Sequence, residues 1–256
     1  MATTINAAFD QFLECLSATP AETEAATSQK LRGESGFTGF FRVGSFENGT
    51  NVFGYSDVDY FAVIPESSPR CDSHRLLVTA AAALRSRFPN TGVRSDSPAV
   101  VLPCGQDPSE STKVMPVYDV GLTERGFRRF VIPDSSGGWI SAAPDAHNEY
   151  LRAVDPGHGG RARSLIRFLK GWKHLRSVPI SSFYLELVAA EYARGQEAII
   201  YDIDLRNVFE TTAATSLAPY LGPKMHGEFL IPVRRLLIKW RPSQKSEIQL
   251  HCRGRR

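Results

Sequence analysis

The side chains best suited to chemistry in this sequence are two acidic residues separated by one position, Asp57 and Asp59. On an extended strand successive side chains point to opposite faces, so these carboxylates point the same way, about 6–7 Å apart. Two unpaired carboxylates are costly to keep ionised side by side, and a divalent cation removes that cost. Because Mg²⁺ binds one or two carboxylates together with substrate phosphates, the pair predicts a metal and phosphate site.

A Gly-Ser pair, Gly44 and Ser45, precedes the two acids and ends an apolar segment at residues 40–43. Glycine allows a ligand to approach the backbone closely, and a serine hydroxyl donates a hydrogen bond, so both suit a triphosphate. The linker of residues 46–56 is rich in Gly, Asn and Ser, as loops are, and residues 58–64 are again apolar. An isolated Asp-x-Asp is usually a solvated strand edge, but the order of strand, Gly-Ser turn, loop and strand favours the phosphate site.

These segments resemble the nucleotidyltransferase superfamily of the DNA polymerase β type, and within it the bacterial cGAS/DncV-like nucleotidyltransferases (CD-NTases). The likeness covers about residues 5–230 and continues through the segments 130–151, 164–173, 178–193 and 198–209. It implies an α+β fold with two lobes, in which a mixed-sheet polymerase β-like core is followed by a helical half. It also implies a Mg²⁺- or Mn²⁺-dependent transferase that makes cyclic di- or oligonucleotide second messengers from NTPs in anti-phage defence, acting on a downstream effector through its product.

The same resemblance assigns roles to individual residues. It makes Asp57 and Asp59 the catalytic, metal-binding carboxylates, and it makes Gly44, Ser45 and Ser182 contacts of the NTP phosphates. In the helical half it implies one lysine on the triphosphate and one aromatic ring on the base, for which we expect Lys170 (otherwise Arg167 or Lys173) and Tyr184 (otherwise Phe183). The plainer alternatives are a solvated basic helix face and, for the serine before Ser182, an ordinary helix cap.

The third carboxylate that completes the metal site in this superfamily is missing. In the resembled branch it stands three residues before a proline, and that position is Lys113, before Pro116. Asp119 has the right strand parity but lies about 20 Å further along an extended chain, and Glu110 has the wrong parity. Three explanations remain open: a catalytically impaired nucleotide-binding homologue, an altered position, or an enzyme that works with two carboxylates.

Composition is that of an ordinary globular protein, with 42% hydrophobic and 22% charged residues in 256. No segment has the length of a membrane span, the N-terminus lacks a signal pattern, and the four scattered cysteines fit neither zinc nor a disulfide framework, so we expect a cytoplasmic protein.

Residues 233–256 carry eight basic side chains and one acidic, a net +7, so the preceding 232 residues carry −4 of the total +3. We interpret residues 231–256 as an aberrant or disordered basic tail rather than a nucleic-acid-binding segment, because the resemblance stops before it.

Apolar periodicity and capping residues predict the elements that position these side chains. We expect a catalytic core over residues 1–145 and a helical nucleotide-gripping domain over 146–230. The expected helices cover 4–17, 19–31, 72–88, 146–153, 161–176 and 181–192, the expected strands include 99–104 and 112–120, and 121–145 is expected to be a loop. A transferase acting on an RNA, protein or small-molecule acceptor is the remaining alternative.

Overall fold

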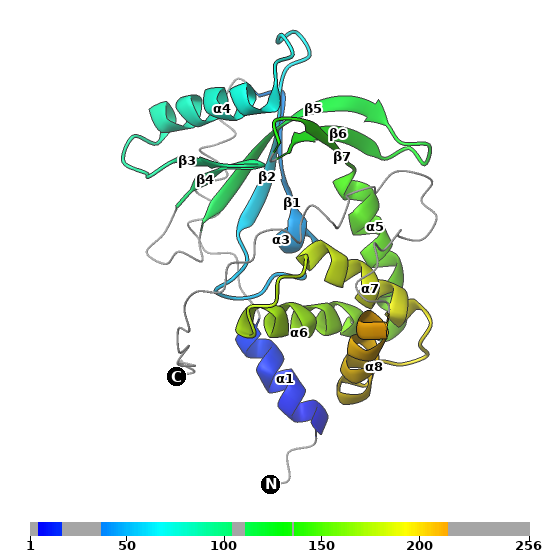
Figure 1. The fold of residues 1–256 in the computed structure, drawn as a ribbon. Coiled ribbons are helices and arrows are strands. Elements are labelled where there is room, and N and C mark those ends of the chain that lie inside the picture. The colour runs from blue at the N-terminus through cyan, green and yellow to red at the C-terminus, as the bar shows by residue number, and fades with distance from the viewer. Residues whose placement is uncertain (1–4, 17–36, 104–110, 135, 215–256) are drawn as a thin grey trace.

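The computed structural model describes residues 5–16, 37–103, 111–134 and 136–214. A mixed sheet occupies one end of the molecule and a group of helices the other (Figure 1). The predicted α+β class is therefore confirmed. The predicted helix 19–31 and the basic tail 231–256 lie outside the described residues, and the division of the chain at residue 145 stays a prediction.

The sheet contains the two strands that the sequence predicted around the Gly-Ser and Asp-x-Asp segments. One ends just before Gly44, and the other carries Asp59. Its strand order is β1-β2-β5-β4-β3, and β6 and β7 extend from the far half of the long strand β5. Strands β2 and β5 are parallel, and the other neighbours are antiparallel. The bounds are β1 Gly39–Val43, β2 Val58–Val63, β3 Arg94–Asp96, β4 Ala99–Leu102, β5 Thr112–Leu122, β6 Arg128–Pro133 and β7 Trp139–Ala142.

Both faces of the sheet are covered, which explains why β2 reads as an almost continuous apolar run. Helix α4 (Ser73–Arg87) lies along one face, where Leu77 and Leu84 pack against the apolar side chains of β4. Asp72 caps that helix by accepting a hydrogen bond from the backbone N–H of Arg75 at 2.8 Å. On the other face, Phe61 of β2 packs in a cluster with the fully buried Phe130 of β6.

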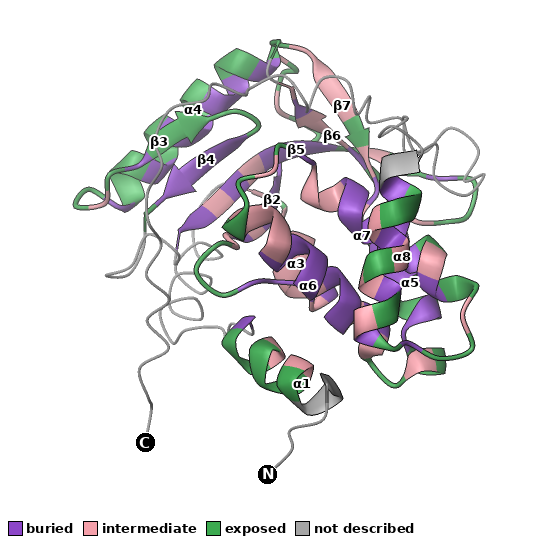
Figure 2. Cartoon of the chain, turned by 60° about the horizontal axis from the view of Figure 1, so that its bottom comes forward, coloured by how far each residue is buried: buried purple, intermediate pink, exposed green. Residues whose placement is uncertain are grey.

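Helix α6 lies among the other helices and is mostly buried (Figure 2). Its Leu165, Ile166 and Leu169 are fully buried. Helix α3 is a single short turn that lies between the sheet and α6 (Figure 1). The bounds are α1 Ile5–Leu16, α3 Gly44–Asn48, α5 Pro144–Val154, η2 Pro156–His158, α6 Arg161–Leu175, α7 Ser182–Arg194 and α8 Tyr201–Ala214. Among the described residues, no helix is both long and apolar enough to cross a membrane.

The expectation of a loop over residues 121–145 was wrong, because this stretch contains the hairpin of β6 and β7 and the start of α5. Its strands are partly exposed and short, so the alternation that marks a strand is weak. The turn between them is closed by Asp134, whose carboxylate accepts hydrogen bonds from the backbone N–H groups of Ser136 and Gly138, both at 2.7 Å. Phe130 anchors the hairpin in the core of the sheet.

Candidate functional site

Asp59 and Gly44, both predicted site residues, are in direct contact. Asp59 pairs with Val43 across strands β1 and β2, so its carboxylate faces the turn that begins at Gly44. A Cβ on Gly44 would stand 2.7 Å from Asp59 Oδ2, and the backbone there has φ +73°. Only glycine satisfies both the positive φ and the close approach, which explains why the turn requires it.

The side chain of Asp59 is half-buried on strand β2. The pKa of Asp59 is raised to about 7, chiefly by desolvation and also by the charge of nearby Asp57, while the charges of Lys113 and Lys170 partly offset these effects. Lys170 belongs to α6. Because its charge lowers the pKa of Asp59, the helical half must lie close to the acidic pair. A carboxyl group held this way favours its neutral form unless a further cation is present.

Lys113 occupies the position expected for the third carboxylate. It is the cross-strand partner of Asp59 on β5, and its Nζ lies 2.5 Å from Asp57 Oδ2. The other oxygen of Asp57 accepts a hydrogen bond from the hydroxyl of Ser111. Burial lowers the pKa of Lys113, but its hydrogen bond to Asp57 and the charges of Asp57, Asp59 and Asp96 raise it above the ordinary value overall, so this lysine remains an ammonium ion.

The residues present do not fit a divalent metal centre. Both oxygens of Asp57 are engaged, and a positive charge lies on the side of Asp57 that a metal ion would share with Asp59. Within the described part of the chain no group of three or more His, Cys, Asp or Glu side chains could hold a metal. Asp119 does not replace the missing acid, because it pairs with Arg128 at 2.8 Å and is exposed in the far half of β5. Glu110 lies outside the described residues.

The helical half contributes Ser182, the first residue of α7, together with Lys173 of α6. Lys173 Nζ donates a hydrogen bond to Ser182 Oγ at 2.7 Å. Burial and the charge of Lys170 lower the pKa of Lys173. Ser181 caps α7 by accepting a hydrogen bond from the N–H of Tyr184. The lysine beside the predicted phosphate-binding serine is therefore Lys173, which the sequence offered only as an alternative.

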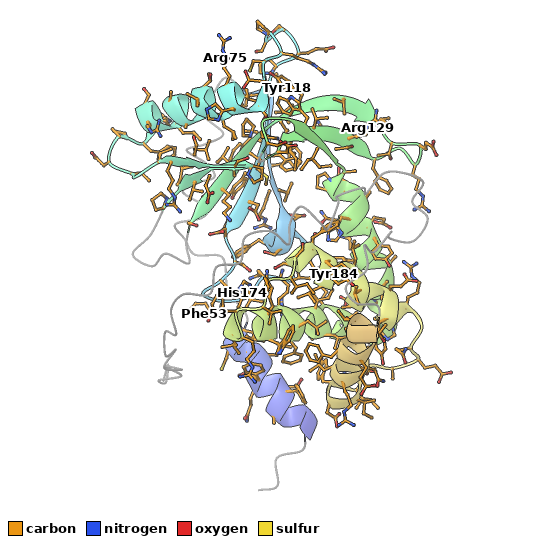
Figure 3. The ribbon with its side chains drawn as sticks, viewed as in Figure 1. Phe53, Arg75, Tyr118, Arg129, His174 and Tyr184 are labelled. Atoms are coloured by element: carbon orange, nitrogen blue, oxygen red, sulfur yellow. The ribbon has the colours of Figure 1, made fainter. Side chains whose placement is uncertain are left out.

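Lys170 and Tyr184 lie deeper than expected. Lys170 is only 2% exposed, and its ammonium is 2.9 Å from Glu186 Oε1. Tyr184 is 3% exposed and belongs to the core of the helical half (Figure 3). Phe183, the other aromatic candidate, is half-buried and packs against the ring of His147, with centroids 4.6 Å apart. Triphosphate binding by Lys170 and base stacking by Tyr184 would require these side chains to leave their packed positions.

An aromatic pair that the sequence did not single out lies next to Lys173. The ring of Tyr55 stacks on that of His174, with centroids 4.6 Å apart and planes 12° from parallel. Burial and the charges of Lys173 and Lys170 lower the pKa of His174 to about 4, so the imidazole is neutral at pH 7. Phe53, in the same loop, is 57% exposed (Figure 3). The only sequence signal for this pair was the presence of aromatic residues in the loop after Ser45.

One curated protein and several solved structures are similar to this chain. No family model matches the chain. An 83-residue segment, 32% of the chain, is 30% identical to a probable cyclic nucleotide synthase of Bacillus cereus (strain VD146), and it spans 25% of that relative's length. Among solved structures, CdnC of E. coli MS115-1, solved with ATP, has a TM-score of 0.64 at 20% identity, with 89% of this chain and 74% of that chain covered.

A second solved structure supports the same conclusion. The CdnE cyclic dinucleotide synthase of Elizabethkingia meningoseptica, solved with GTP and Apcpp, has a TM-score of 0.65 at 20% identity, with coverage of 81% of this chain and 83% of that chain. The resemblance predicted from the motifs is thus confirmed: the chain has the nucleotidyltransferase fold of the cGAS/DncV-like CD-NTases.

Proposed function

We propose that this chain binds nucleoside triphosphates as cyclic nucleotide synthases do, but that Lys113 prevents it from carrying out their transfer chemistry. The observation behind the proposal is the 2.5 Å contact between Lys113 Nζ and Asp57 Oδ2, opposite Asp59. An ammonium ion cannot coordinate a metal, and it repels a divalent cation at this distance. The acidic pair then has a permanent partner within the chain.

The residues for binding a triphosphate are present. Ser45 and Ser182 supply hydroxyl groups, and Lys173 supplies an ammonium that already donates to Ser182. A lysine can bind phosphate as a point charge, and in this site Lys113 supplies a second cation. Gly44 makes room for the carboxylate of Asp59 beside the turn, since a Cβ there would stand 2.7 Å from Asp59 Oδ2. The relatives solved with ATP and GTP support the assignment of NTPs as the ligands.

The test combines binding with turnover in three proteins. Wild type, Lys113→Glu and Lys113→Gln are each incubated with the four labelled NTPs and Mg²⁺ or Mn²⁺, treated with phosphatase, and chromatographed. We expect all three to bind NTP and only Lys113→Glu to yield a phosphatase-resistant product, because glutamate restores a carboxylate whereas glutamine only removes the charge. Equal product from wild type would refute the proposal that Lys113 prevents the transfer reaction. A wild type that binds no NTP would refute the proposed function as a whole.

A second candidate function is an active synthase that works with two carboxylates. It is favoured by the presence of Asp59 on β2 and of Asp57 just before it, with Gly44 fitted against Asp59. In that case the chain would be a cytoplasmic, Mg²⁺- or Mn²⁺-dependent enzyme that makes cyclic di- or oligonucleotide messengers from NTPs for anti-phage signalling through an effector. Product from the wild-type arm of the same assay would select this candidate.

A further inference from the structure

The carboxylate of Glu186 is the centre of a buried polar network that joins the sheet half to the helices. It accepts a hydrogen bond from Thr50 Oγ1 at 2.6 Å and one from Asn48 Nδ2 at 3.4 Å. Lys170 Nζ lies 2.9 Å from Oε1, and His147 Nε2 lies 2.7 Å from Oε2. All five residues are buried. One side chain of α7 therefore contacts groups from α3, α5, α6 and the loop after α3.

Two of these contacts hold the segment that carries Gly44 and Ser45. Asn48 is the last residue of α3, which begins at Gly44. The backbone N–H of Thr50 donates to the carbonyl of Ser45 at 2.9 Å, so Thr50 closes the turn and at the same time reaches Glu186 through its hydroxyl. The position of the Gly-Ser turn is thus coupled to α7 through a single hydroxyl–carboxylate hydrogen bond and the weaker amide contact of Asn48.

The residues proposed to contact phosphate lie one helical turn from this network. On α6, Lys173 follows Lys170 by three positions, and on α7, Ser182 precedes Glu186 by four. Residues three and four apart on a helix share a face and lie about 5–6 Å apart. The network therefore fixes the Gly-Ser turn against the same faces of α6 and α7 that present Lys173 and Ser182.

Burying charged side chains in this network costs desolvation free energy that apolar side chains would not. A buried ion pair is often no more stabilising than hydrophobic residues of the same size, so stability alone does not explain it. Burial raises the pKa of Glu186, but the charge of Lys170 and the hydrogen bonds from His147 and Thr50 outweigh burial and hold it well below its usual range. What such a network adds over apolar side chains is direction, because hydrogen bonds restrain both distance and angle.

We propose that Thr50 and Glu186 are positioning residues that hold the Gly44-Ser45 turn at the separation from Lys173 and Ser182 that a triphosphate requires. The ligand in this inference rests on the proposed NTP binding, whereas the positioning of the turn does not. Neither residue touches the ligand. Their effect on binding is transmitted through the backbone of α3.

The matched variants are Thr50→Val and Thr50→Ser. Valine keeps the shape and removes the hydroxyl, whereas serine keeps the hydroxyl and removes a methyl group. We expect Thr50→Val to weaken NTP binding about tenfold or more, the size of a lost hydrogen bond to a charged group, and to leave binding of the unphosphorylated nucleoside unchanged. Thr50→Ser should retain most of the NTP affinity. Glu191→Gln, on the exposed side of α7, should match wild type.

A second measurement keeps the test independent of any ligand. In amide hydrogen exchange, Thr50→Val should speed exchange over residues 44–51 and leave strand β4 protected, and Thr50→Ser should not. If wild type binds no NTP, the proposed function fails while exchange still decides the positioning role. If Thr50→Val does not fold, Glu186→Gln is used, which loses the acceptor facing Asn48 and His147 and should loosen the same residues. Unchanged exchange and affinity in the folded variant would overturn the inference.

Discussion

Lys113 and Asp59 are cross-strand partners on the parallel strands β2 and β5, and the lysine reaches past this position to contact Asp57. One residue of β5 therefore supplies a cation to Asp59 of β2 and to Asp57, which lies just before that strand. A carboxylate at the same position would face the same two acids and complete a set of three. In the proposed function, the charge of this one side chain decides whether Asp57 and Asp59 are paired with an ammonium group of the chain or bind a metal ion.

We expect metal binding to follow that charge. Lys113→Glu should bind Mn²⁺, detected by loss of the free-ion signal in electron paramagnetic resonance, whereas wild type should not bind it at the same concentrations. At a Mn²⁺ concentration of one hundred times Kd, the variant should gain about 2.7 kcal/mol in free energy of unfolding. Lys113→Gln serves as the control for removal of the positive charge alone. Mn²⁺ binding of equal strength by wild type would contradict the self-neutralised site.

Gly44 and Gly54 provide a matched pair for testing the close approach to Asp59. Both have a positive φ, +73° and +75°, but a Cβ at Gly54 has no neighbour within 4 Å. Gly44→Ala and Gly54→Ala therefore share the backbone strain, about 1–2 kcal/mol, and only the first adds a clash. Urea unfolding should show Gly44→Ala to be the more destabilised variant. Equal losses would mean that Asp59 moves away at no cost.

His174 should titrate far below the usual range. Its pKa is lowered from 6.5 to about 4 by burial and by the charges of Lys173 and Lys170, so the folded protein resists protonation that the unfolded chain accepts. His174 therefore contributes stability above pH 6.5 that is lost as pH falls towards 4. Imidazole NMR should place its midpoint near 4. The variant His174→Gln should show a weaker loss of stability between pH 6.5 and 4, and an ordinary midpoint near 6.5 would contradict the buried environment.

The buried pair of Lys170 and Glu186 should behave differently from the exposed pair of Glu191 and Arg194. Lys170→Met leaves the Glu186 carboxylate buried without its main counter-ion, which costs about 3–5 kcal/mol in free energy of unfolding. Lys170→Met combined with Glu186→Leu should cost less than the two single changes together. Arg194→Met removes a partner that lies 3.6 Å from Glu191 at the surface and should cost about 0–1 kcal/mol. Chemical unfolding of the four variants measures these differences.

Lys173, rather than Lys170, should carry affinity for the triphosphate. Lys173→Gln should weaken NTP binding about tenfold, the size of a charge-assisted hydrogen bond, with little change in thermal stability, because its ammonium bonds only the half-buried Ser182 among the described contacts. Calorimetric titration with NTP and with the nucleoside separates the phosphate contribution from the base contribution. If the nucleoside affinity falls equally, Lys173 acts on the base or on the fold instead.

The sequence predicted the parts of the site that local rules govern. Asp59 lies on β2 and Gly44 begins a turn with a positive φ, as residue type and spacing predicted, whereas Asp57 lies just before the strand. Helices such as α4 and α7 were predicted because capping residues and an apolar stripe mark them. Helix α3 extends into a stretch where a loop was expected from residue 46, and α8 was not predicted. The resemblance implied that Lys113 takes the place of the third carboxylate on a neighbouring strand, and the structure pairs it with Asp59.

The remaining features depend on tertiary packing. Lys170 and Lys173 lie on one helix face, and the sequence does not determine which of them meets a buried glutamate and which meets Ser182. Tyr184 and Phe183 differ by 100° around α7, and the packing of α6 against α7 decides which ring is buried. The network around Glu186 was missed because its members come from four separate segments. The hairpin of β6 and β7 was predicted to be a loop because its turn residues are polar and its strands show only a weak alternation of apolar and polar residues.

The lysine at position 113 also bears on the history of this chain. Lysine and glutamate codons differ by a single base, so the proposed metal-excluding state lies one point mutation from the proposed metal-binding one, in either direction. The rest of the arrangement remains in place, including the glycine fitted against Asp59 and the network under the Gly-Ser turn. A lineage that lost activity at this codon would be able to regain it without rebuilding the site, for as long as the ability to bind nucleotides preserved the surrounding residues.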